Sequence, residues 1–192
     1  MFGPDYRPEG IEVQVAELLV ATADGADPLI DEVVPDVLKL LRQRLNMDVV
    51  FVSQFVDGRR VFRHTSQTPG REVIAVGGSD PLEEAWCQRV VDGRLPEFMP
   101  DAQKHLESGA APTVSIPIGT HLSTPIVLKD GTIYGTLCCF SFGVNPQSSE
   151  RDLKHLKFTA HLTGLKIEQE REYQEIRQRL AQAPASGSKG RG

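Results

Sequence analysis

The segment that most constrains the fold runs from His121 to Phe142, where two strand-forming stretches flank a tight turn. His121–Leu128 and Ile133–Phe142 are joined by Lys129-Asp130-Gly131-Thr132, and an Asp-Gly pair between two apolar runs is a strong hairpin signal. The second stretch carries almost only apolar or small side chains, which is typical of a strand covered on both faces. We therefore expect an antiparallel hairpin whose second strand lies at the centre of a sheet.

A second hairpin is predicted nearer the N-terminus. Val49–Val56 is rich in β-branched and aromatic residues and is too short for another helix, so it is predicted to be a strand. Asp57-Gly58 follows it as a type I′ turn, and Arg60–Thr65 forms the returning strand. A further short strand is expected at Glu72–Val76.

Helical patterns precede the first hairpin. Apolar residues recur on one helical face in 10–22 and again in 28–45. Asp27 is a candidate N-cap with Pro28 at the first helical position, whereas Pro35 should kink or restart the second helix.

Between the hairpins, Gly77–Pro81 is expected to be a loop that opens a helix over 80–91, capped by Ser79 or Asp80. The stretch 94–113 contains three prolines and is expected to be irregular, with a helical turn near 101–107. So long an irregular stretch in a compact domain is often a binding loop.

A last helix is predicted from about Glu150 to Gln182, after a cap at Ser148 or Ser149, because its composition favours helix without a break. The fold class is therefore α/β in the α+β sense: a central antiparallel sheet with helices on one face. The expected organisation is a flexible start at 1–9, a domain at 10–168 with N-terminal helices at 10–45 and a core at 46–148, a helix extension at 169–182 and a disordered tail at 183–192.

Charge and composition indicate where the protein is located and which classes of partner it binds. The net charge is -5 with no basic stripe, so nucleic acid is not an expected partner. No apolar run approaches the length of a membrane span, and the first residues do not resemble a signal peptide, so a cytoplasmic protein without membrane contact is expected. The three cysteines include no Cys-x-x-Cys pair, and no metal site is predicted.

The chain resembles a GAF domain of the bacterial sensor type. The resemblance is carried above all by His121-Leu122-Ser123-Thr124-Pro125-Ile126-Val127-Leu128-Lys129-Asp130-Gly131-Thr132-Ile133-Tyr134-Gly135-Thr136-Leu137-Cys138-Cys139-Phe140. The Asp57-Gly58 hairpin and Trp86–Pro96 support it, and the similar region extends from about Leu29 to Glu168. The resemblance implies a GAF-like, six-stranded antiparallel sheet with a ligand pocket over one face, covered by 77–118.

Three cysteines are candidates for chemistry in such a pocket. Cys87 could hold a bilin or act as a redox thiol, but Gln88 stands where bilin-binding members commonly have His, which disfavours the bilin. Cys138 and Cys139 should point to opposite faces of their strand, one toward the pocket and one toward the helices. Buried, unreactive packing is the alternative for all three cysteines.

The other candidate pocket residues are aromatic, basic or acidic. Trp86 is a large side chain that is expected to pack beneath the segment 77–118. His105 or His121 could bind haem, although a single His is more often a hydrogen-bonded structural residue. The remaining candidates are Arg89, Arg94 and Asp101, which could grip a polar ligand or form solvated ion pairs.

These observations favour a stand-alone sensor or regulatory domain that binds a small molecule and signals through its terminal helices in a homodimer, with a separate output protein as a further partner. A cysteine-dependent redox enzyme and a ligand-free structural interaction domain are the alternatives. The sequence does not name the ligand.

Overall fold

The computed structural model describes residues 9–20 and 30–182. Its centre is a six-stranded antiparallel sheet with strand order β3-β2-β1-β6-β5-β4. The strands are β1 (Val49–Val56), β2 (Arg59–Gln67), β3 (Ser79–Pro81), β4 (Phe98–Met99), β5 (His121–Val127) and β6 (Ile133–Phe140). The sequence prediction of an antiparallel six-stranded sheet is confirmed.

Both predicted hairpins are present. Asp57 and Gly58 connect β1 to β2 with φ values of 50° and 70°, the two left-handed positions that a type I′ turn needs. β6 lies between β1 and β5, and its residues from Gly135 onward are buried. Gly135 is required there, because a Cβ at this position would lie 2.0 Å from the carbonyl oxygen of Ser53 on β1.

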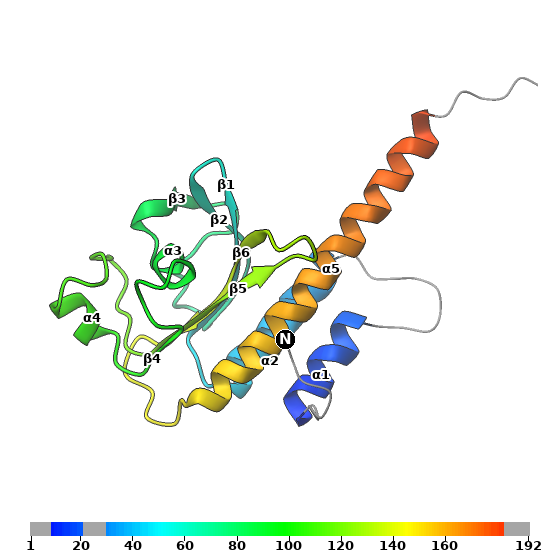
Figure 1. Ribbon diagram of the computed structural model, residues 1–192. Coiled ribbons are helices and arrows are strands. Elements are labelled where there is room, and N and C mark those ends of the chain that lie inside the picture. Colours follow the sequence, from blue (N-terminus) through cyan, green and yellow to red (C-terminus); the bar gives the residue numbers. More distant parts are fainter. Residues whose placement is uncertain (1–8, 21–29, 183–192) are drawn as a thin grey trace, which may run out of the picture.

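The three long helices cover one face of the sheet (Figure 1): α1 (Gly10–Val20), α2 (Ile30–Arg44) and α5 (Glu150–Gln182). Their buried side chains form one core with residues such as Val50, Leu137 and Cys139. α2 continues through Pro35, so the predicted restart is wrong over the described part of this helix. The expected N-cap at Asp27, the start at 1–8 and the tail at 183–192 lie outside the described residues.

The opposite face is covered by residues 82–118, which we call the covering segment. It contains the 3-10 helix η1 (Leu82–Glu84), α3 (Trp86–Val91), β4 and α4 (Gln103–Glu107), and it packs a second core against the sheet. The prediction that helices lie on one face therefore holds for the long helices, while the short helices of the covering segment lie on the other.

Two local predictions in this region are wrong. Glu72–Val76 is not a strand, because the amides of Val73 and Ile74 donate to Oε1 of Gln67 at 2.8 and 3.0 Å instead of pairing with another strand. Ser79–Pro81 is an edge strand beside β2, so the helix expected over 80–91 begins only at Trp86.

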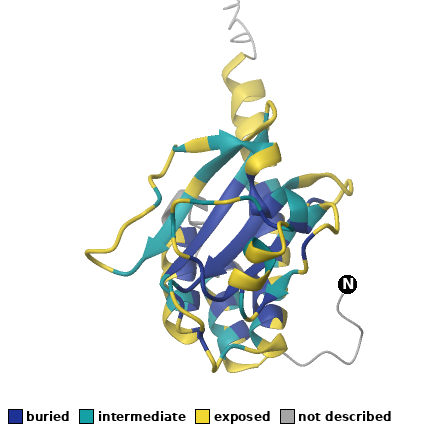
Figure 2. Ribbon diagram, turned by 90° about the vertical axis from the view of Figure 1, so that its left-hand side faces the viewer, coloured by how far each residue is buried: buried dark blue, intermediate teal, exposed yellow. Residues whose placement is uncertain are grey.

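α5 begins and ends at the predicted residues, Glu150 and Gln182. The backbone N–H of Ser149 donates to the carboxylate of Asp152 at 3.0 Å, which is one half of a capping box. The C-terminal part of α5 projects beyond the sheet (Figures 1 and 2), and Tyr173, Ile176 and Leu180 are exposed there. In the part of the chain that is described, no helix has the length and apolar character needed to cross a membrane.

Candidate functional site

A pocket of about 330 Å³ lies between the sheet and the covering segment. Its wall is mainly aromatic and aliphatic, with a few polar groups, which is the usual composition of a small-molecule site. The lining residues come from β1, β2, β3, η1, α3, β5, β6 and the connecting segments: Phe51, Arg60, Phe62, Val73, Ile74, Asp80, Glu84, Trp86, Thr113, Val114, Ser115, Ile116, Ile118, His121 and Phe140.

Hydrogen bonds from side chains to backbone carbonyls link different parts of the covering segment to one another. Trp86 donates from Nε1 to the carbonyl of Pro112 at 2.8 Å, and Arg89 donates to the carbonyl of Ala110 at 2.7 Å. Gln103 donates to the carbonyl of Ile118 at 2.9 Å. These three bonds join distant parts of an otherwise irregular stretch that forms one side of the pocket.

His121 is a buried polar group in the pocket wall. Its ring lies edge-on to Trp86 with a centroid distance of 5.5 Å. Burial, followed by the charges of Arg60 and His105, lowers the pKa of His121 to about 3, so the imidazole is neutral near pH 7. Its Nδ1 has no hydrogen-bond partner among the described residues. A buried nitrogen in a pocket wall that lacks a partner is suited to receive a polar group of a ligand or a water.

Arg60 and Asp80 form a partly buried ion pair at another part of the wall. Nε of Arg60 donates to Oδ1 of Asp80 at 2.9 Å, and Nη2 donates to Oδ2, so the pair is bidentate. Burial alone would lower the pKa of Arg60, but the negative groups of Cys87 and Asp80 raise it overall, and the guanidinium stays charged. The guanidinium also lies over the Phe62 ring at 4.7 Å.

Two of the candidate cysteines meet directly behind this ion pair. Nη1 of Arg60 lies 3.3 Å from Sγ of Cys87, and Sγ of Cys87 lies 3.1 Å from Sγ of Cys138. Cys139 points to the other face and packs in the core beneath the helices. The predicted opposite orientation of Cys138 and Cys139 is confirmed. The contact between Cys87 and Cys138 was not predicted from the sequence.

The other candidate residues lie away from the lining. Arg94 is exposed and pairs with Asp92 on the surface, at 2.7 Å. Asp101 pairs with Lys104 at 3.5 Å. Arg89 is bound to Ala110 of the covering segment. Of the eight sequence candidates, only Trp86 and His121 line the pocket, with Cys87 and Cys138 behind the wall.

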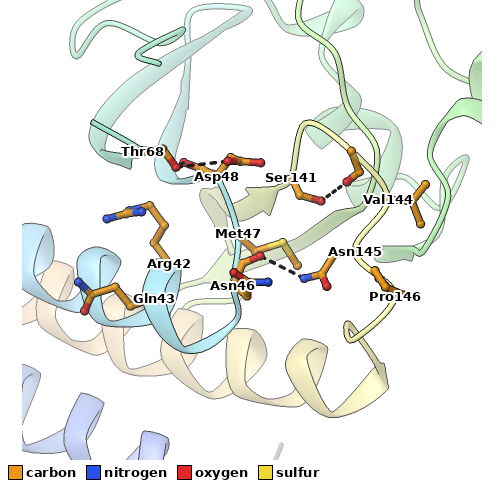
Figure 3. Close-up of a pocket in the computed structure, with 11 residues that line it drawn as sticks. Arg42, Gln43, Asn46, Met47, Asp48, Thr68, Ser141, Val144, Asn145 and Pro146 are labelled. Atoms are coloured by element: carbon orange, nitrogen blue, oxygen red, sulfur yellow. Dashed lines mark hydrogen bonds between the residues drawn. The ribbon is translucent and has the colours of Figure 1, made fainter. Parts of the chain in front are cut away.

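A second hollow, which we call the polar hollow, lies near the turn after α2 and the segment after β6 (Figure 3). Several polar groups in this hollow are already hydrogen-bonded to other parts of the protein. The Asp48 carboxylate accepts from the Phe142 amide at 2.8 Å, and the Asn145 side chain donates to the carbonyl of Asn46 at 3.1 Å. These bonds join loops, so the polar hollow is a weaker candidate than the pocket beneath the covering segment.

The chain belongs to the GAF domain family, whose model matches residues 29–168. GAF domains are typically sensor or regulatory domains that bind small molecules. No curated protein matches the chain significantly.

Solved structures support the same fold. The GAF domain of an Acinetobacter phosphoenolpyruvate-protein phosphotransferase is 14% identical, with a TM-score of 0.67 over 84% of this chain and 93% of that chain. Its counterpart from Coxiella burnetii is 18% identical, with a TM-score of 0.68 over 86% and 95%. Free methionine-R-sulfoxide reductase from Neisseria meningitidis, solved with its substrate, is 14% identical, with a TM-score of 0.66 over 85% and 89%. At these identities the likeness concerns the fold alone.

The described residues contain no group of three or more His, Cys, Asp or Glu side chains that could hold a metal ion. Sequence reasoning missed Arg60 and Asp80, which belong to paired strands in the structure. The local sequence gives little indication of this pair. Arg60 follows a hairpin turn and is predicted to lie on a strand, but the pattern around Asp80 predicts a helix cap, so the two residues are not expected to lie on paired strands.

Proposed function

We propose that this GAF domain binds a small, largely apolar molecule with one polar edge in the pocket beneath the covering segment, and that binding is reported through α5 in a homodimer. The single observation that carries the proposal is the unpartnered Nδ1 of buried His121 in an aromatic pocket of about 330 Å³. A neutral imidazole there can donate one hydrogen bond or accept one, depending on its tautomer.

The pocket wall restricts the ligand class. Phe51, Phe62 and Trp86 favour a flat or apolar body. The guanidinium of Arg60 is already paired with Asp80, so the described residues that line the pocket offer no unpaired cation for a strongly anionic ligand. A neutral metabolite with a hydrogen-bonding group near His121 fits these features best.

A tetrapyrrole fits this pocket poorly. Sγ of Cys87 is fully buried, contacts Cys138 and Arg60, and does not line the pocket, so it is poorly placed to form a thioether to a bilin. The volume of about 330 Å³ is at the low end for drug-sized ligands, which favours a compact metabolite over a bilin or haem.

A short path connects the pocket with α5. His121 begins β5, and β5 packs directly against α5 near Gly164, where a Cβ would lie 3.1 Å from the carbonyl oxygen of Val127. A ligand that shifts β5 can therefore shift α5, by an amount set by its differential affinity for the two arrangements. Exposed apolar side chains on the projecting part of α5 suit a second copy of the chain, and a separate output protein would respond to that dimer in the cytoplasm.

The test is ligand capture with two matched variants. The protein is incubated with a small-metabolite extract and analysed by native mass spectrometry. Val114→Phe fills the pocket, and Val144→Phe adds the same side chain at the exposed wall of the polar hollow. The proposal expects a bound compound on wild type and Val144→Phe but not on Val114→Phe. Capture that only Val144→Phe abolishes would place the ligand in the polar hollow instead.

A further inference from the structure

Two buried cysteines from distant parts of the chain meet behind the pocket. Cys87 lies in α3 of the covering segment, and Cys138 lies in the central strand β6. Their sulfurs are 3.1 Å apart, and neither side chain is exposed. A disulfide bond needs a separation of about 2.05 Å, so the sulfurs have to approach by about 1 Å.

The surroundings of the two sulfurs differ. Cys138 lies among neutral hydroxyls, with Ser123 Oγ at 3.0 Å and Thr136 Oγ1 at 3.2 Å. Cys87 lies against the guanidinium of Arg60 at 3.3 Å. The hydrogen bond from Cys138, followed by the charge of Arg60, lowers the pKa of Cys87 against the effect of burial. Burial and the neighbouring Cys87 raise the pKa of Cys138. The contact with Arg60 therefore makes Cys87 the sulfur of the pair that is better placed to carry a negative charge.

We propose that Cys87 and Cys138 form a peroxide-reactive dithiol that closes to a disulfide between α3 and β6. This activity is separate from ligand binding. It is inferred from the contacts that Cys87 makes with Cys138 and with Arg60. Cys87 is the attacking nucleophile, Cys138 resolves the oxidised sulfur, and Arg60 is a positioning residue that holds Cys87 as the thiolate.

The oxidant is a small hydroperoxide such as hydrogen peroxide. The Cys87 thiolate attacks one peroxide oxygen, a sulfur–oxygen bond forms, the oxygen–oxygen bond breaks, and hydroxide leaves. That hydroxide takes the proton of Cys138 to form water. The Cys138 thiolate then attacks the Cys87 sulfenic acid, the sulfur–sulfur bond forms, and a second hydroxide leaves. Two cysteine sulfurs are oxidised and one peroxide is reduced, and an added dithiol reverses the change.

Access runs through the pocket. Arg60 lines the pocket, and its Nη1 lies 3.3 Å from Sγ of Cys87, so this side chain lies in contact with both the pocket and the sulfur. A peroxide of two heavy atoms can pass when the Arg60 side chain moves, whereas a bulky alkylating reagent is excluded. Oxidation removes the negative charge beside Arg60 and links α3, which also contains Trp86, covalently to β6.

The chain supplies a matched control in Cys139. It is equally buried and adjacent to Cys138, but it points to the other face. Burial, followed by the charge of Asp152, raises the pKa of Cys139, so this sulfur stays a thiol. The full chain is treated with hydrogen peroxide while folded, then denatured, alkylated and mapped by mass spectrometry. We expect a Cys87–Cys138 disulfide in wild type and in Cys139→Ser, and a dimedone-reactive sulfenic acid at Cys87 in Cys138→Ser.

Arg60 is tested by the pH profile of the same reaction. We expect Arg60→Gln to slow disulfide formation roughly tenfold or more near neutral pH and to make the rate rise with pH, with partial rescue by Arg60→Lys. The proposal is overturned if folded wild type retains both thiols after peroxide treatment, or if Cys139 is oxidised as readily as Cys87. The wild-type result is decisive even where a variant fails to fold.

Discussion

His121 is the residue whose protonation ties the pocket to the stability of the fold. The unfolded chain takes up a proton on this side chain below its ordinary pKa of 6.5, whereas the folded state keeps it neutral down to about 3. The unfolded state therefore binds more protons in this window, and stability is fully present above pH 6.5 and falls as the pH drops. Between pH 6.5 and 5 we predict a loss of about 2 kcal/mol in the free energy of unfolding.

The comparison for this prediction is His121→Gln, which cannot titrate. Urea unfolding of both proteins across this pH range should show a steeper loss for wild type, whatever the offset between them. Parallel pH dependences would mean that His121 is protonated as easily in the folded state as in the unfolded state.

Gly135 is the second single residue on which the fold depends. A Cβ there would meet the Ser53 carbonyl oxygen at 2.0 Å, and this oxygen belongs to the backbone of β1, which cannot easily move aside. We predict that Gly135→Ala destabilises the protein by about 1–3 kcal/mol or more, as overpacking does. Gly143→Ala is the matched control, because a Cβ at Gly143 meets nothing within 4 Å. Equal stability of the two variants in urea unfolding would contradict this reading of β6.

At the scale of elements, the covering segment depends on Trp86. Trp86→Phe keeps an aromatic side chain but removes the 2.8 Å bond to the Pro112 carbonyl. We predict faster hydrogen exchange across 103–118 and a loss of about 1 kcal/mol in the free energy of unfolding. Unchanged exchange in that range would show that the bonds from Arg89 and Gln103 hold the segment without Trp86.

The elements also show what the sequence could and could not reveal. The hairpins at Asp57-Gly58 and Asp130-Gly131 and the helix α5 follow from local signals, namely turn residues, strand-like runs and helix-forming composition. β3 has only three residues, and its pairing with Arg59–Val61 is a contact between distant segments. The strand expected at Glu72–Val76 had suitable residues, but the Gln67 side chain binds its amides.

The same limit applies to the site. Trp86 and His121 could be placed near a pocket by resemblance to the GAF family. The Arg60–Asp80 pair and the Cys87–Cys138 contact could not, because each joins segments that only the folded chain brings together. Arg94 and Asp101 had suitable chemistry, but the structure places both in surface ion pairs.

At the scale of the whole molecule, we predict a homodimer through the projecting part of α5. Tyr173, Ile176 and Leu180 are 51%, 54% and 70% exposed, so changing them should leave the monomer fold intact. Light scattering should give a dimer for wild type and a monomer for the triple change of these residues to Glu. The control changes Gln174, Gln178 and Gln182 to Glu, which adds the same charge without removing apolar surface. A monomeric wild type at high micromolar concentration would contradict the prediction.

The most direct test of the binding site uses the single tryptophan of the chain, Trp86, which lines the pocket. The compound captured from the metabolite extract is titrated into the protein while the emission of Trp86 is recorded. We predict a saturable change in emission with wild type and Val144→Phe, and none with Val114→Phe. Binding detected by mass that leaves the Trp86 emission unchanged would contradict the assignment of this pocket as the ligand site.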